Sequence, residues 1–203
     1  MGDLGGERAR DFDRFLTFVD AIVAIAITLL VLPLVDLAGS FQGDSVTRLL
    51  SESSNQIWAF FLSFVVIADL WLAQHRVLHN VVDSHQVLIR LMLLWSLTIV
   101  VLPFPTALVA GNTGQQAVTK ALYVGTMAVS ALILALMCVV IRRHPEIRDS
   151  TESPDSLRAF AMCGAFVLAL GVMVLVPSLS YWPLLLLLLP DRLVPLWRGR
   201  PGA

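Results

Sequence analysis

Charged residues are scarce in this chain: they make up 14% of its 203 residues, whereas 57% are hydrophobic, and the mean hydropathy is +0.80. A water-soluble domain could not bury so much apolar surface. The composition therefore excludes a soluble protein and predicts an integral membrane protein. The formal net charge of −1 gives no indication of nucleic-acid binding, so the expected partner is the lipid bilayer rather than a nucleic acid.

Cysteine is also rare, with only Cys138 and Cys163, each inside an apolar segment. Two such residues give no disulfide framework and no metal-ligand spacing. The chain lacks the alternating ten-residue pattern of a membrane barrel, so helices must satisfy the backbone inside the bilayer. We expect neither a bound metal nor a cofactor.

The N-terminal segment lacks the charge pattern of a secretory signal peptide. Ala38-Gly39-Ser40 offers a weak cleavage site, but Asp11 and Asp13 mix with the arginines before the apolar run, and Asp20 interrupts its approach. Signal peptides begin with a positively charged region followed by an uninterrupted apolar one. A retained membrane helix is therefore expected, with cleavage as the alternative.

Long apolar runs dominate what the chain does contain. A helix needs about twenty apolar residues to cross the hydrocarbon core, and six segments meet this length. Pro183 and Pro190 interrupt the last of them. The prediction is an all-α membrane protein, one six-helix unit over residues 1–203, with spans at about 14–35, 54–75, 87–110, 117–141, 158–177 and 179–197.

The basic residues predict how these spans are oriented. With six spans, both termini lie on one side, and all fourteen basic residues except Arg48 and Lys120 fall on that side. Lys and Arg accumulate in cytoplasmic loops, so both termini are expected to be cytoplasmic. The external loop over 36–52 carries Asp36, Asp44 and Glu52, which would raise the local cation concentration if repeated around an assembly.

The first span carries a candidate pore face. At about 100° per residue, Ala21, Ile25, Thr28 and Leu32 fall in a narrow stripe, about 10 Å long from Ile25 to Leu32. A ring of such helices would stack an Ile layer, a hydroxyl layer and a Leu layer around an ion path. The alternative is ordinary helix packing, with the Thr28 hydroxyl bonded to the carbonyl of Ala24.

Asp20 lies on a different face of the same span, and a carboxylate there needs a partner. Arg14, His75 and Arg76 are the candidates. We interpret this group as a support that attaches the first span to the second, rather than as part of the ion path.

The pattern Arg14-x-x-x-Phe18-x-Asp20 resembles the signature of the endosomal and lysosomal potassium channel family known as transmembrane protein 175, in its prokaryotic branch. This chain has Val19 where the signature has serine. Two shorter segments also resemble the family: Trp71-Leu-Ala-Gln-His75-Arg on the second span, with Gln74 in place of a histidine, and Pro103-Phe104-Pro105-Thr106 at the end of the third.

This resemblance implies a potassium-preferring cation channel without a Thr-Val-Gly-Tyr-Gly filter, a segment that this sequence lacks. It implies a homotetramer of six-helix subunits in which the first helix lines a central pore. Ile25, Thr28 and Leu32, preceded by Ala21, would then form the constriction and filter. Arg14, Phe18, Asp20 and His75 would form the supporting network. Potassium and other monovalent cations are the expected permeating species, in a prokaryotic plasma membrane.

Two other functions compete with the channel. A secondary transporter would use Asp20 and Asp69 as ion or proton carriers. A haem carrier or intramembrane enzyme would be built on His75 and His79, whose spacing of four places them on one helix face. Because no nucleophile–base pair or convincing third ligand accompanies these histidines, we expect a protein that is not an enzyme.

Overall fold

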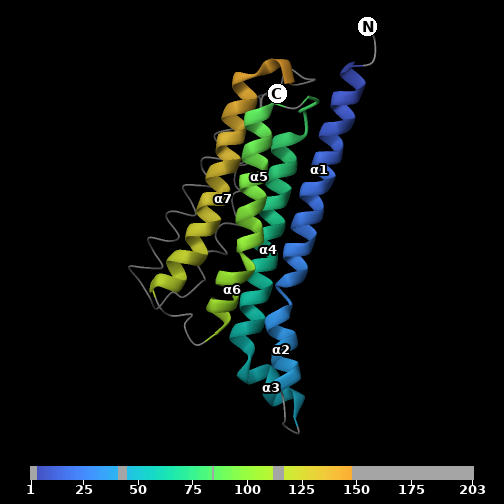
Figure 1. Ribbon diagram of the computed structural model, residues 1–203. Coiled ribbons are helices and arrows are strands. Elements are labelled where there is room, and N and C mark those ends of the chain that lie inside the picture. The colour runs from blue at the N-terminus through green and yellow to red at the C-terminus, as the bar shows by residue number, and fades with distance from the viewer. Residues whose placement is uncertain (1–3, 41–44, 84, 112–116, 148–203) are drawn as a thin grey trace, which may run out of the picture.

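The computed structural model describes residues 4–40, 45–83, 85–111 and 117–147, and within these ranges the chain forms an elongated, all-α bundle (Figure 1). This agrees with the predicted fold class. The elements in chain order are α1 (Leu4–Leu29), α2 (Leu32–Ser40), α3 (Val46–Glu52), α4 (Ser54–Leu78), α5 (Gln86–Val101), α6 (Pro103–Ala110), α7 (Ala117–Arg143) and the short 3₁₀ helix η1 (Pro145–Ile147).

Four helical segments in this part of the chain are long and apolar enough to cross a membrane. They are Arg10–Gly39, Ser54–Leu78, Gln86–Ala110 and Ala117–Arg143, and they coincide with the first four predicted spans. The predicted spans at 158–177 and 179–197 lie outside the described residues. Six spans and cytoplasmic termini therefore remain predictions.

The first and third spans are each divided by a proline into two helices. Leu30 and Val31 form a turn between α1 and α2, and Leu102 separates α5 from α6. Pro33 and Pro103 follow these points, and proline has no amide hydrogen to donate to the carbonyl four residues earlier. The expectation of an uninterrupted helix over 14–35 is corrected accordingly, so Leu32 belongs to α2 rather than to α1.

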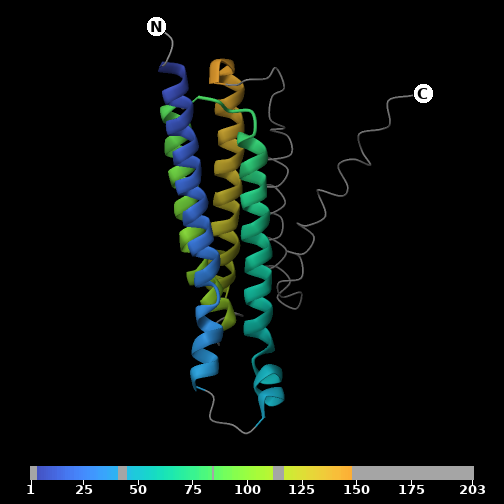
Figure 2. The ribbon, with the colours of Figure 1, turned by 90° about the vertical axis from the view of Figure 1, so that its right-hand side faces the viewer.

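The core of the bundle lies between α5 and α7, with α4 and α6 packed against α7 and α1 packed against α5. Trp95 and Met92 of α5 and Tyr123 and Met127 of α7 are among its fully buried side chains. Figure 2 shows the same helices running side by side along the long axis, with α1 in front of α5. The first span therefore lies along one side of the bundle.

Three buried hydroxyl groups connect α4, α6 and α7. Ser63 Oγ lies 2.7 Å from Tyr123 Oη and 2.9 Å from Thr106 Oγ1, and all three residues are almost completely buried. Hydroxyls inside a membrane protein are stable where they bond to each other or to the backbone. Thr106 also donates to the carbonyl of Leu102, at 2.8 Å, so this network supports the interrupted third span.

The start of α1, the α4–α5 connection and the end of α7 lie together at one end of the bundle (Figure 1). There the rings of His85 and His144 stack with centroids 4.1 Å apart, and the Val82 amide donates to the Ile147 carbonyl at 2.9 Å. His144 Nδ1 also lies 2.7 Å from Glu146. A backbone hydrogen bond and this histidine contact hold the pKa of the Glu146 carboxyl below its ordinary value.

Candidate functional site

The α1 stripe, which we define as Ala21, Ile25, Thr28 and Leu32, is exposed along its whole length. Ile25 is 59% exposed and Leu32 is 50% exposed. Within the described part of the chain, these side chains are therefore left open rather than packed into the core. The interruption at Leu30 and Val31 does not bury Leu32, although this residue now belongs to α2.

The opposite face of the same span packs into the bundle. Four of its side chains, Val19, Val23, Ala26 and Leu30, are at most 2% exposed. Their spacing of three to four residues is that of a single helix face. The first span thus has two apolar faces. One is buried in the core, and the other, which carries the α1 stripe, is exposed; we call it the open face.

Thr28 supplies the polar group of the α1 stripe. Its hydroxyl donates to the carbonyl of Ile25, at 2.7 Å, rather than to the carbonyl of Ala24 considered in the sequence analysis. A hydroxyl has one hydrogen to donate and two lone pairs to accept with. With the hydrogen engaged by its own helix, the exposed Thr28 oxygen keeps its lone pairs for a ligand outside the chain.

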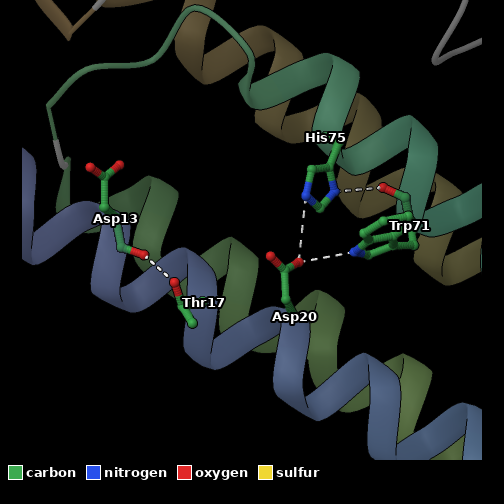
Figure 3. Close-up of polar contacts among 5 residues, drawn as sticks. All are labelled: Asp13, Thr17, Asp20, Trp71 and His75. Atoms are coloured by element: carbon green, nitrogen blue, oxygen red, sulfur yellow. Dashed lines mark hydrogen bonds and ion pairs between the residues drawn. The ribbon is translucent and has the colours of Figure 1, made fainter.

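Asp20 on α1 contacts two residues of α4, as Figure 3 shows. The Trp71 indole Nε1 donates to Asp20 Oδ1 at 2.9 Å, and His75 Nε2 lies 3.6 Å from the same oxygen. The Trp71 and His75 rings are neighbours, with centroids 4.4 Å apart. We call Asp20, Trp71 and His75 the Asp20 network; it connects the first span to the second, which is the arrangement that the scaffold interpretation requires.

The two nitrogens of His75 meet different groups. Nδ1 lies 3.2 Å from the carbonyl oxygen of Trp71, and a carbonyl can only accept. Nδ1 therefore carries a hydrogen in this arrangement, and Nε2 can donate to Asp20 only when the imidazole is protonated on both nitrogens. The contact between Asp20 and His75 is thus an ion pair only for a charged histidine, whereas the bond from Trp71 does not depend on protonation.

The other residues predicted for the network have different surroundings. Arg14 is exposed on α1, and Phe18 is 55% exposed, with its ring 6.5 Å from that of Phe15. Arg76 lies 4.0 Å from Asp69 on its own helix, which supplies a partner for Asp69. The membership of Arg14 and Phe18 in the network remains a prediction.

Trp71 is the member of the Asp20 network that the sequence analysis did not assign. Two signals pointed to it: an indole N–H inside a membrane span needs an acceptor, and Trp71 is four residues from His75, on the same helix face. Because tryptophans near span ends are common interface anchors, these signals did not distinguish it.

The described residues contain no group of three or more His, Cys, Asp or Glu that could hold a metal ion. His79, the proposed metal partner of His75, faces Asn80 with Nδ1 and Oδ1 2.7 Å apart. The arrangement thus gives no support to a site built on His75 and His79.

The comparisons with known proteins agree with the resemblance seen in the sequence. Residues 14–103 match the family model described as endosomal/lysosomal potassium channel TMEM175. This segment contains the α1 stripe, the Asp20 network and the beginning of the Pro103 motif. The search of curated proteins found no match.

A solved structure has the same fold. It is the crystal structure of a lysosomal potassium-selective channel TMEM175 homolog from Chamaesiphon minutus, with a TM-score of 0.70 and 23% sequence identity. The match covers 94% of this chain and 100% of that one.

Proposed function

We propose that this chain, whose residues 14–103 match the TMEM175 family model, is a potassium-preferring cation channel whose pore is lined by the α1 stripe. The family is described as a potassium channel family, and the solved protein of the same fold is named a potassium-selective channel. The observation that carries the proposal is the exposure of the α1 stripe, with Thr28 between Ile25 and Leu32.

The chemistry of the α1 stripe suits a narrow cation path. Rings of Ile25 and Leu32 would form apolar constrictions that conduct only when they are wide enough to hold water. Between them, the Thr28 oxygens would replace part of the hydration shell of a passing cation. The stripe contains no basic residue, so nothing on it repels a cation.

One copy of the first span cannot enclose a path. We therefore propose a homotetramer of six-helix subunits, each a single unit over residues 1–203, arranged around an axis next to the α1 stripe. The termini would be cytoplasmic, and the assembly would lie in a prokaryotic plasma membrane. Asp36 and Glu52 would then belong to the external mouth, where Glu52 pairs with Arg48 at 2.8 Å.

The carboxylates within the spans fit a supporting role better than a transporting one. Asp20 accepts from Trp71, and Asp69 lies beside Arg76. Both therefore have protein partners, as buried or half-buried charges require. A secondary transporter that uses these residues as carriers is not favoured.

Ion flux in reconstituted vesicles tests the proposal. Purified protein in potassium-loaded liposomes should discharge a potassium gradient and, in planar bilayers, give single-channel currents that are larger for potassium than for sodium. Liposomes without protein provide the control for leakage. Saturable uptake coupled to a second ion, or the absence of current at every voltage and pH, would contradict the channel.

A further inference from the structure

The interruption of the first span leaves backbone carbonyls without a helical donor. The amides of Leu30 and Val31 donate to the carbonyls of Ile27 and Thr28, each at 3.3 Å, and the amide of Leu34 donates to the carbonyl of Val31 at 2.9 Å. The carbonyl of Leu29 would ordinarily receive the amide of residue 33, but Pro33 has none. Within the described residues, no backbone amide donates to it.

This carbonyl lies in an exposed part of the chain. Leu29 is 39% exposed, and Val31 and Leu32 on the far side of the turn are 40% and 50% exposed. Non-helical backbone at membrane depth is stable only where it is buried in protein or lines a water-filled cavity, because lipid cannot hydrogen-bond to it. Within the described residues, Leu30 packs into the bundle whereas Leu29, Val31 and Leu32 stay exposed, so we expect the exposed side of the turn to face a hydrated path.

The interruption of the third span is resolved differently. There Pro103 withholds its amide from the carbonyl of Ile99, but the amide of Leu102 donates to that carbonyl at 3.2 Å. Thr106 donates to the carbonyl of Leu102 through both its amide, at 3.1 Å, and its hydroxyl, at 2.8 Å. Leu102 and Thr106 are buried. The carbonyl from which Pro103 removes the helical donor is therefore paired within the described chain.

The groups at the first break are suited to a monovalent cation. The Thr28 oxygen has given its hydrogen to Ile25, and the adjacent Leu29 carbonyl has no amide donor. Both ligands are neutral oxygens, the type that replaces water around potassium in selectivity filters, whereas calcium sites rely on carboxylates.

We propose that the Leu29 carbonyls, freed by Pro33, form a cation-binding layer next to the Thr28 hydroxyls, repeated around the axis of the assembly. This proposal rests on the proposed function and adds a backbone ligand to it. Pro33 is then a residue that determines selectivity without contacting the ion.

The substitution Pro33→Ala tests this directly, because alanine supplies the missing amide and allows the helix to continue through Leu29. We expect the variant to conduct, with a potassium-to-sodium permeability ratio lowered roughly two- to tenfold, as for the loss of one hydrogen-bond-sized interaction. Pro103→Ala is the matched control, because the Ile99 carbonyl already has an amide donor, and it should keep the wild-type ratio.

The possible outcomes distinguish a failure of the proposed carbonyl layer from a failure of the proposed channel function. If Pro33→Ala conducts with the wild-type ratio, or if Pro103→Ala changes the ratio equally, the carbonyl layer is refuted while the channel stands. If the wild-type protein passes no current, the proposed function fails first.

A measurement on the unmodified protein covers the case in which Pro33→Ala does not assemble. Crystals soaked in thallium(I), which replaces potassium and scatters anomalously, should give a peak within coordination distance of the Leu29 carbonyl oxygens. Thallium peaks along the axis that avoid this level would overturn the proposal.

Discussion

The first span and α7 are almost equally apolar, yet the chain buries them to very different extents. In the most apolar window of each, 22% of the residues of Arg10–Gly39 are buried within the chain, against 56% for Ala117–Arg143. Helix α7 packs on α4, α5 and α6 and contributes more buried hydrophobic residues to the core than any other described helix. The comparison teaches that hydropathy identifies spans but not roles: a span that leaves one face open has that face available for an ion path or a partner subunit.

The largest expected effect comes from widening the proposed pore at the Leu32 ring of the α1 stripe. Leu32→Ala removes most of an exposed side chain and should raise single-channel conductance severalfold, because an apolar constriction conducts more readily when it is wider and wetter. Leu132→Ala makes the same change at an exposed position of α7.

Single-channel conductance measured in planar bilayers shows whether the first span or α7 lines the pore. The α7 variant should conduct like the wild type. An equal increase in both variants would mean that the first span is not specifically the pore wall.

A smaller effect should follow from removing the hydroxyl on the open face. Thr28→Val keeps the side-chain shape and should lower the potassium-to-sodium permeability ratio roughly two- to tenfold. Thr126→Val is the matched change on α7, where the hydroxyl donates to the carbonyl of Leu122 at 2.7 Å.

Reversal potentials under bi-ionic conditions measure both ratios. Selectivity should change in the Thr28 variant alone. If Thr28→Val kept its selectivity, the assignment of the hydroxyl layer would be wrong even in a conducting channel.

The smallest effect concerns the attachment of the first span to α4. A double-mutant cycle with Asp20→Ala and Trp71→Phe should give a coupling free energy of about 0.5–1.5 kcal/mol, the usual net value for one hydrogen bond. Denaturant unfolding in a mild detergent gives the free energies of unfolding of the wild type, the two single variants and the double variant.

The pair Arg48 and Glu52, exposed on α3, serves as the control cycle. Its coupling should be smaller because solvent screens exposed ion pairs. A coupling near zero for Asp20 and Trp71 would show that their contact does not hold the two spans together.

The sequence predicted much of this arrangement because its signals are local. Apolar length located the four described spans, and Asp20 inside a span required a partner, for which His75 was a candidate. The resemblance predicted the match of residues 14–103 to the TMEM175 family model and supplied the proposed roles of the α1 stripe. Each of these inferences uses residues close together in the chain or a fixed pattern.

What the sequence did not predict depends on how distant residues pack. Val23 and Ile25 are both β-branched and apolar, yet one is buried and the other exposed, because only the position of α5 and α4 selects the core face. Likewise, nothing local distinguishes Pro33 from Pro103. At the second break the Leu102 amide donates to the Ile99 carbonyl, whereas within the described residues no backbone amide donates to the Leu29 carbonyl at the first.

Cysteine accessibility tests the central claim most directly. In a background with Cys138 and Cys163 replaced by serine, Ile25→Cys on the open face and Val129→Cys at an exposed position of α7 would each be treated with a cationic, water-soluble thiol reagent during recording. The account predicts rapid, irreversible block of the Ile25→Cys current and an unchanged Val129→Cys current. A reagent that leaves Ile25→Cys currents intact, although the channel conducts, would contradict a pore lined by the first span.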